Sequence, residues 1–327
     1  MDALIRWGTD IILALQNVPW LSGLMRLFTF LGQEEFFLFV MPALYWCIAP
    51  ALGARLAVLL ILSNGLNSLL KLAFHLPRPY WVDPRIRALS SEISYGLPSG
   101  HAMNATSVWG FLAAQVKRPW AWAAALALIF LISLSRLYLG VHFPLDVLAG
   151  WIFGALVLGA FLAWERPVVA WLKRLKLWQQ LALASALSLV FLALSGGILA
   201  AIAPLPDPVL WERNAALVMA TKSGKPAIAP RDLAGGVTVA GMILGLGLAF
   251  VLSLHHPARF EVKGPWAKRA LRFIIGLAGV LILWLGLKLL TPAKPVVLAM
   301  FGRYIRYGLV VFWALYLAPW AFARLNL

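Results

Sequence analysis

The sequence has few charged residues, a single cysteine and few acids, and each shortage excludes a class of protein. Charged residues make up 12% of the 327 positions, whereas hydrophobic residues make up 62%. A soluble globular domain carries about 25% charged residues, so this composition indicates a polytopic membrane protein. The one cysteine, Cys47, lies in an apolar run, which excludes a disulfide framework and a cysteine-based metal site.

The acidic residues are too few and too scattered to hold catalytic metal ions. The chain has 12 of them, and no group of acids and histidines has the spacing of a two-metal hydrolase. The sequence also lacks a glycine-rich loop ending in GKS or GKT, which would bind ATP phosphates. We therefore expect no metal and no cofactor. The net charge of +16 is spread through short loops, as orientation signals are in membrane proteins, so no nucleic-acid partner is expected.

Long apolar runs fill most of the chain, and a run of about 20 residues can cross a bilayer as a helix. Nine such runs predict an all-α fold, a polytopic transmembrane helical bundle embedded in the lipid bilayer. The predicted spans are approximately 35–52, 54–73, 101–117, 119–136, 146–164, 179–203, 233–254, 269–290 and 302–323. The stretch 3–32 carries polar residues at helical intervals and is broken near Pro19. Interfacial helices are favoured there, with a tenth span as the alternative.

Lysine and arginine in the loops predict the orientation of these spans. The loops after the third, fifth and seventh spans hold the dense basic residues, which are Lys117, Arg118, Arg166, Lys173, Arg174, Lys176, Arg259, Lys263, Lys268 and Arg269. The loops on the other side are more dilute and also contain acids. Because positively charged loops stay in the cytoplasm, loops 74–100 and 137–145 should face the extracytoplasmic side.

Ionisable residues near membrane depth are costly, and those that occur indicate function. Here they form three clusters, KLAFHLPRP at Lys71–Pro79, LPSGHAMN at Leu97–Asn104 and SRLYLGVHFPLD at Ser135–Asp146. The first two clusters begin and end one outer loop, and the third returns to the same face two spans later. Their three permanent cations have no matching carboxylates, so we expect them to face an anion. Phosphate fits, because arginine offers a planar fork and lysine a point charge.

Two histidines in these clusters have different neighbours, which predicts different roles. Asp146 lies four residues after His142 and can bind one ring nitrogen, leaving the other nitrogen with a lone pair that can attack phosphorus. His101 has no nearby carboxylate in sequence and can protonate a leaving oxygen. Ser99, Gly100 and His101 also begin a span, where free backbone N–H groups bind phosphate, although a turn with a helix cap is the simpler interpretation of PSG alone.

The motifs K-x6-RP, PSGH and SR-x5-H-x3-D are complete and in this order. In this the chain resembles the type 2 phosphatidic acid phosphatase superfamily, over about residues 30–165. The resemblance implies a helical bundle and a metal-independent phosphatase that acts through a phosphohistidine. It implies that His142 is the nucleophile, Asp146 its orienting partner and His101 the general acid. The implied phosphate cradle consists of Lys71, Arg78, Ser99, Gly100 and Arg136.

The resemblance suggests three parts of the chain: N-terminal interfacial helices at 1–33, a catalytic bundle at 34–165 and an extension of four spans at 166–327. In the sequence segments RPYW and PSGHAM, and in the four extra spans, the chain is similar to the glucose-6-phosphatase branch. The motif residues recognise the phosphate and do not indicate what the rest of the substrate is.

Three functions are therefore compared. The favoured one is an integral membrane phosphatase acting on a lipid phosphomonoester or diphosphate at the extracytoplasmic side. This preference rests on outer-loop residues that suit a membrane interface, which are Tyr80, Trp81, Ile86, Leu89, Ile93 and Tyr95. The alternatives are a phosphatase of a small soluble ester such as a sugar phosphate, and a non-catalytic transporter of phosphate compounds.

Overall fold

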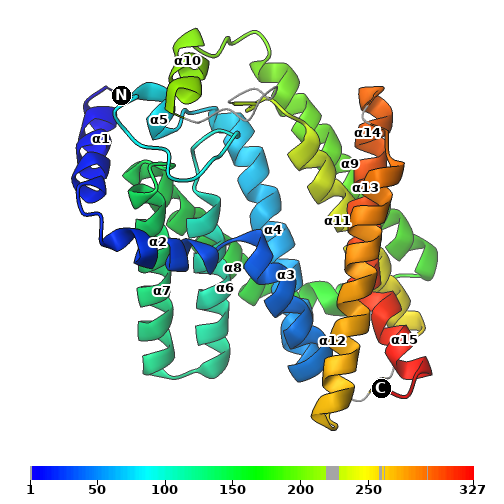
Figure 1. Ribbon diagram of the computed structural model, residues 1–327. Coiled ribbons are helices and arrows are strands. Elements are labelled where there is room, and N and C mark those ends of the chain that lie inside the picture. Colours follow the sequence, from blue (N-terminus) through cyan, green and yellow to red (C-terminus); the bar gives the residue numbers. More distant parts are fainter. Residues whose placement is uncertain (1, 219–227, 258–259, 261, 293) are drawn as a thin grey trace. The chain divides into compact units, whose positions relative to one another are not determined.

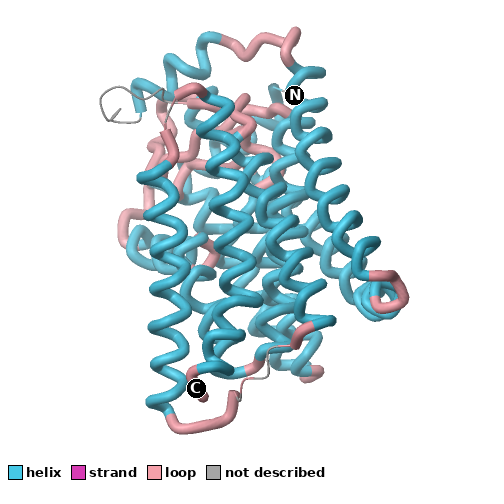
Figure 2. The backbone as a smooth tube through the Cα atoms, turned by 90° about the vertical axis from the view of Figure 1, so that its right-hand side faces the viewer, coloured by secondary structure: helices cyan, strands magenta, loops and turns pink. Residues whose placement is uncertain are grey.

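The computed structural model describes residues 2–218, 228–257, 260, 262–292 and 294–327, which form helices joined by loops, with no strand among them (Figures 1 and 2). The first helices are α1 (Asp2–Gln16), α2 (Leu21–Phe30), α3 (Glu34–Ala43), the π-helix η1 (Leu44–Ile48), α4 (Pro50–Phe74), α5 (Pro79–Val82), α6 (Gly100–Val116), α7 (Pro119–Tyr138) and α8 (Pro144–Leu172). The later helices are α9 (Leu177–Ile202), α10 (Val209–Val218), α11 (Ala234–His255), α12 (Trp266–Leu281), η2 (Ile282–Gly286), α13 (Leu287–Leu290), α14 (Val296–Phe312), η3 (Trp313–Leu317) and α15 (Ala318–Arg324).

Within these described ranges, seven helices are long and apolar enough to cross a membrane, or eight if the bent pair α1 and α2 is one broken span. The polytopic helical bundle is thereby confirmed. The first and third predicted spans are also helical, but their helices are shorter than the seven counted above, since α3 with η1 covers 34–48 and α6 has 17 residues. The count of nine spans stays a prediction.

The chain divides into two units by its internal contacts. The first unit comprises residues 1–37, 62–160 and 197–232, and the second comprises 38–61, 161–196 and 233–327. Residues 197–232, which the sequence placed in the C-terminal extension, thus pack within the first unit. The predicted division at 1–33, 34–165 and 166–327 stays a prediction.

Helices α1 and α2 meet at 114° and belong to the first unit. The Gln16 side chain fastens α1 to the outer loop, because its Nε2 donates to the Arg87 carbonyl at 2.8 Å and its Oε1 accepts from the Arg87 N–H at 3.0 Å. The location of these helices at a membrane interface stays a prediction, but their contacts tie them to the loop that carries the motif residues.

Small residues bring α8 close to α6. A Cβ at Gly150 would lie 2.7 Å from the Ser99 carbonyl oxygen, and one at Gly154 would lie 2.6 Å from the Met103 carbonyl oxygen. Two glycines four residues apart let helix backbones approach in a membrane protein. The Ser99 N–H then donates to the Asp146 carbonyl at 2.9 Å, which joins the start of α6 to the start of α8.

The outer loop 83–99 is irregular and its aromatic neighbours are buried. Tyr80, Trp81, Ile86 and Tyr95 are all 0% exposed and belong to one hydrophobic cluster of the first unit. Their expected role at a membrane interface is therefore wrong for these four side chains, because the segment 197–218 covers the loop. Of the set, Ile93 remains well exposed.

Helix α10 supplies that cover. Asn214 Nδ2 donates to the Trp81 carbonyl at 3.0 Å, and the Trp211 ring lies 6.0 Å from the Trp81 ring. Before α10, Asp207 accepts from the Tyr95 hydroxyl at 2.9 Å. These contacts fix the outer loop to the segment 207–214.

The second unit is held by close helix packing. In α11, a Cβ at Gly241 would meet the Tyr304 carbonyl of α14, and Ser188 of α9 donates to the Ala240 carbonyl at 2.6 Å. Near the ends of helices, Arg55 pairs with Glu165 at 2.5 Å.

Candidate active site

The pair His142 and Asp146 lies where the loop after α7 enters α8. His142 Nδ1 is 3.3 Å from Asp146 Oδ2, and the same oxygen accepts the Phe143 N–H at 2.8 Å. Phe143 directly precedes α8 and Asp146 is in its first turn, so the carboxylate reaches back to an otherwise free N–H as in a capping box. Both side chains are buried. The local helix start therefore fixes the aspartate that faces the imidazole.

The other nitrogen of His142 faces Arg78, whose Nη1 lies 3.3 Å from Nε2. Because a guanidinium can only donate, this contact assigns the lone pair to Nε2 and the proton to Nδ1, toward Asp146. Burial and then the positive charge of Arg78 hold the pKa of His142 well below its usual range. The imidazole is thus neutral near pH 7, with the lone pair of Nε2 directed at Arg78.

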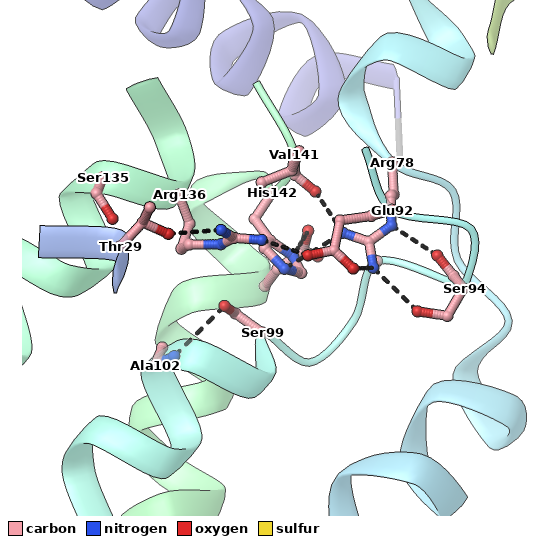
Figure 3. A network of polar contacts seen from close by, with 12 residues as sticks. Thr29, Arg78, Glu92, Ser94, Ser99, Ala102, Ser135, Arg136, Val141 and His142 are labelled. Atoms are coloured by element: carbon pink, nitrogen blue, oxygen red, sulfur yellow. Dashed lines mark hydrogen bonds and ion pairs between the residues drawn. The ribbon is translucent and has the colours of Figure 1, made fainter. Parts of the chain in front are cut away.

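Arg78 is held in one orientation by the loop around it (Figure 3). Its Nε donates to the Ser94 carbonyl at 2.6 Å and its Nη1 to the Val141 carbonyl at 2.9 Å. Its Nη2 donates to Ser94 Oγ and to the Tyr95 carbonyl, both at 3.1 Å. With His142, these partners use all five N–H groups of the guanidinium, and the contact to His142 Nε2 is the longest of the five at 3.3 Å.

Arg136, at the end of α7, is also buried, and one of its three nitrogens has no hydrogen-bond partner (Figure 3). Its Nη1 donates to Thr29 Oγ1 at 2.7 Å and its Nη2 to Glu92 Oε1 at 2.5 Å. Its Nε is buried and has no partner. Thr29 belongs to α2, so a helix expected only to lie at the interface orients a cradle arginine.

Lys71, near the end of α4, donates its ammonium to the Tyr95 carbonyl at 2.5 Å, with the Gly96 carbonyl at 3.4 Å. It therefore approaches the site from the side of the outer loop. Ser99 is the N-cap of α6, and its Oγ makes only a long contact of 3.5 Å with the Ala102 N–H. Gly100 follows at the first helical position, where a Cβ would lie 3.1 Å from Asn67 Oδ1.

His101 is packed but unpaired. Its Nε2 is buried without a hydrogen-bond partner. A Cβ on Gly32 would lie 2.8 Å from His101 Cδ2, so the glycine between α2 and α3 makes room for the ring. Two buried polar atoms, Arg136 Nε and His101 Nε2, therefore lack hydrogen-bond partners at the same site, although buried polar atoms are usually paired.

The expectation that the three cations have no matching carboxylate is wrong. Glu92 Oε1 binds Arg136, and its Oε2 lies 3.6 Å from Arg78 Nη2. Burial raises the pKa of Glu92, but the charges of Arg78, Arg136, His101 and Lys71 outweigh it and lower the pKa to about 2. Glu92 lies in the irregular loop, which has no periodicity from which its direction could be predicted.

The structure thus brings all eight predicted site residues to the end of the helices where the outer loop lies, and it adds Thr29, Gly32, Glu92 and Ser94. Thr29 and Gly32 carried no motif, and Ser94 gave no signal. Among the described residues, no group of three or more His, Cys, Asp or Glu side chains could hold a metal ion.

Sequence comparisons match two family patterns. The pattern described as PAP2 superfamily matches residues 52–169, and the one described as PAP2 superfamily phosphatase, transmembrane extension, matches residues 237–327. An undecaprenyl-diphosphatase of Sulfolobus acidocaldarius is 30% identical over 142 residues, which cover 42% of this chain and 68% of that protein.

Two further relatives differ in how much they share with this chain. The mouse sphingosine-1-phosphate phosphatase 2 is 35% identical over 150 residues, covering 43% of this chain, and the chain spans only 42% of that relative. Human glucose-6-phosphatase 3 is 28% identical over 355 residues, covering 98% of this chain and 96% of that protein. Among solved structures, a transmembrane PAP2 type phosphatidylglycerolphosphate phosphatase from Bacillus subtilis gives a TM-score of 0.44 at 26% identity, covering 51% of this chain and 89% of that one.

Proposed function

Because the chain belongs to the PAP2 superfamily, we propose that it is an integral membrane phosphatase that hydrolyses a lipid phosphate without a metal, through a phosphohistidine on His142. The observation that carries this proposal is a neutral imidazole nitrogen directed into a buried cationic cradle with two unpaired polar atoms. The sphingosine-1-phosphate and undecaprenyl-diphosphate relatives support a phosphate of a long-chain alcohol as the substrate.

The chemistry proceeds in two displacements at phosphorus. His142 Nε2 attacks the phosphorus, so an N–P bond forms while the P–O bond to the leaving alcohol breaks. His101 donates the proton that the leaving oxygen needs, and Asp146 stabilises the positive charge that develops on the His142 ring. Water then attacks the phosphohistidine, His101 takes the proton of that water, and inorganic phosphate leaves with His142 restored.

The cradle contributes by binding charge that grows on the phosphoryl oxygens. Lys71, Arg78 and Arg136 surround the site, and the N-terminus of α6 at Ser99 and Gly100 supplies backbone N–H groups. Since these groups are already oriented by protein contacts, little reorganisation is needed when the phosphate enters. The positive-inside distribution of the loops supports an extracytoplasmic position for this site.

A glucose-6-phosphatase-like hydrolysis of a soluble sugar phosphate is the second candidate. It is favoured by the alignment with human glucose-6-phosphatase 3 over nearly the whole chain, including the four C-terminal spans. A non-catalytic transporter would use the cradle but would have no need of the His142–Asp146 pair.

A phosphate-release panel tests the proposal. Purified protein in detergent with EDTA is given phosphatidic acid, an isoprenoid diphosphate, a sphingoid-base phosphate and glucose 6-phosphate. We expect release from at least one lipid substrate, more efficient than from glucose 6-phosphate, and a loss of roughly 1000-fold or more in His142→Ala. His75→Asn, a partly exposed histidine of the same outer loop, is the matched control and should keep full activity. Activity that EDTA abolishes and Mg²⁺ restores would contradict the metal-independent mechanism.

A further inference from the structure

Glu92 is an acid within a cradle of cations, and its position differs from that of its partners. Its side chain is 29% exposed, whereas those of Arg78 and Arg136 are 1% exposed. The carboxylate is therefore more accessible to solvent than the two guanidinium groups that it faces. The other acid of the site, Asp146, is buried behind His142 and already accepts from the Phe143 N–H.

Two loop contacts hold Glu92 in this place. Its backbone carbonyl accepts the Tyr80 hydroxyl at 2.5 Å, and the next carbonyl, of Ile93, accepts the Ala229 N–H at 3.0 Å. Tyr80 is fully buried. The hydrogen-bonded backbone on both carbonyls thus fixes the place from which the Glu92 carboxylate reaches the cradle.

A bound phosphate does not need the donors that Glu92 occupies. Glu92 takes Nη2 of Arg136 and leaves Arg136 Nε and His101 Nε2 without partners. A phosphate can bind these two atoms while the carboxylate stays in place. Glu92 is therefore a neighbour of the bound phosphate and not a plug that the phosphate must expel.

The charge balance of the occupied site follows from this arrangement. Lys71, Arg78 and Arg136 carry three positive charges, and the carboxylates of Glu92 and Asp146 carry two negative charges, which leaves a net charge of +1. A phosphomonoester is close to a dianion at pH 7, so once it is bound the site has no positive charge left for a further anionic group. A second phosphoryl group beside Glu92 would be repelled. A carboxylate has about four acceptor positions, and Glu92 uses one in a hydrogen bond with Arg136, so it can accept from a substrate donor.

We infer that Glu92 is a specificity-determining residue, which selects phosphomonoesters whose leaving group carries an ammonium or hydroxyl donor close to the ester oxygen. This inference rests on the proposed function and narrows its substrate class. Sphingoid-base phosphates have both donors beside the phosphate, and sugar phosphates have hydroxyls. Phosphatidic acid and simple alkyl phosphates have no such donor, and isoprenoid diphosphates have none and carry additional negative charge.

The test compares two single-chain substrates of equal length, sphinganine 1-phosphate and octadecyl phosphate, in the same mixed micelles. One hydrogen bond to a charged group corresponds to about 10- to 100-fold in kcat/KM, so wild-type protein should prefer sphinganine 1-phosphate by that factor. In Glu92→Gln this preference should fall at least fivefold, in addition to any loss that the weakened contact with Arg136 causes equally on both substrates. Asp83→Asn is the control, since this acid of the same loop pairs with the exposed Arg85 and should leave the preference unchanged.

The outcomes separate this inference from the proposed function. If wild-type protein hydrolyses neither substrate nor any member of the release panel, the proposed function fails. If it hydrolyses both lipids equally well, the function stands and the role of Glu92 is refuted without any variant. Size exclusion and thermal unfolding show whether Glu92→Gln folds. If it folds and its kcat/KM falls by the same factor on both substrates, Glu92 only positions the arginines and the inference is likewise refuted.

Discussion

Thr29→Val should reduce catalysis although Thr29 carries no motif and comes from an N-terminal helix. The substitution keeps the shape of the buried side chain and removes the oxygen that accepts from Arg136 Nη1 at 2.7 Å. A hydrogen bond to a charged group contributes about 1.5–3 kcal/mol, and each 1.4 kcal/mol corresponds to tenfold. Since Arg136 would keep only its contact with Glu92 among its present hydrogen bonds, kcat/KM should fall by roughly 10- to 150-fold.

The assay measures kcat/KM on a lipid phosphate together with inhibition by inorganic phosphate, which reports on the cradle alone. Both should weaken in Thr29→Val. Thr106→Val is the matched control, because the Thr106 hydroxyl donates to the Ala102 carbonyl of its own helix at 2.8 Å and touches no cradle residue. If Thr29→Val folds and keeps kcat/KM and phosphate inhibition within twofold of wild type, α2 does not position Arg136 and this reasoning is refuted.

Three further predictions concern the histidines and the topology. His142→Ala should abolish formation of a phosphoenzyme. His101→Ala should slow hydrolysis of an alkyl phosphate more than that of nitrophenyl phosphate, because a good leaving group needs little protonation. Equal losses on the two substrates would argue against His101 as the acid. Gly32→Ala should show the same dependence on leaving group in weaker form, since its Cβ would lie 2.8 Å from the His101 ring, while Gly23→Ala, which meets nothing within 4 Å, should behave as wild type. A cysteine introduced at Ser90 should react with a membrane-impermeant thiol reagent from outside intact cells, with the buried native Cys47 as background; reaction only after permeabilisation would reverse the proposed orientation.

The helices and the motif residues could be predicted because both follow from short-range patterns. Apolar runs predict helices wherever they occur, and the spacing of His142 and Asp146 places an acid in the first turn of α8, where it meets the histidine. The contribution of Thr29 could not be predicted in this way, since the contact with Arg136 joins residues 107 positions apart. No local pattern specifies such a pairing.

The burial of the outer-loop aromatic residues could not be predicted for a different reason. Aromatic residues such as Tyr80 and Trp81 suit both a membrane interface and a protein core, and the choice depends on what covers them. Here the cover is α10, which arrives from a distant part of the chain. The contact of Glu92 with the cradle could not be predicted either, because an irregular loop gives no indication of which side chains turn inward.

The anchoring of the outer loop by residues 197–232 also sets the order in which the protein can mature. Tyr95 is synthesised 112 residues before Asp207, the partner that its hydroxyl binds. At 5–20 residues per second, a ribosome needs on the order of ten seconds to reach that partner. From Asp146 onward, for the last 61 residues of this interval, the nascent chain carries all of its motif residues, yet the loop that holds Arg78 still lacks its anchor. All motif residues are therefore synthesised before the segment that anchors the outer loop, and this loop can reach its final structure only after that later segment has been made.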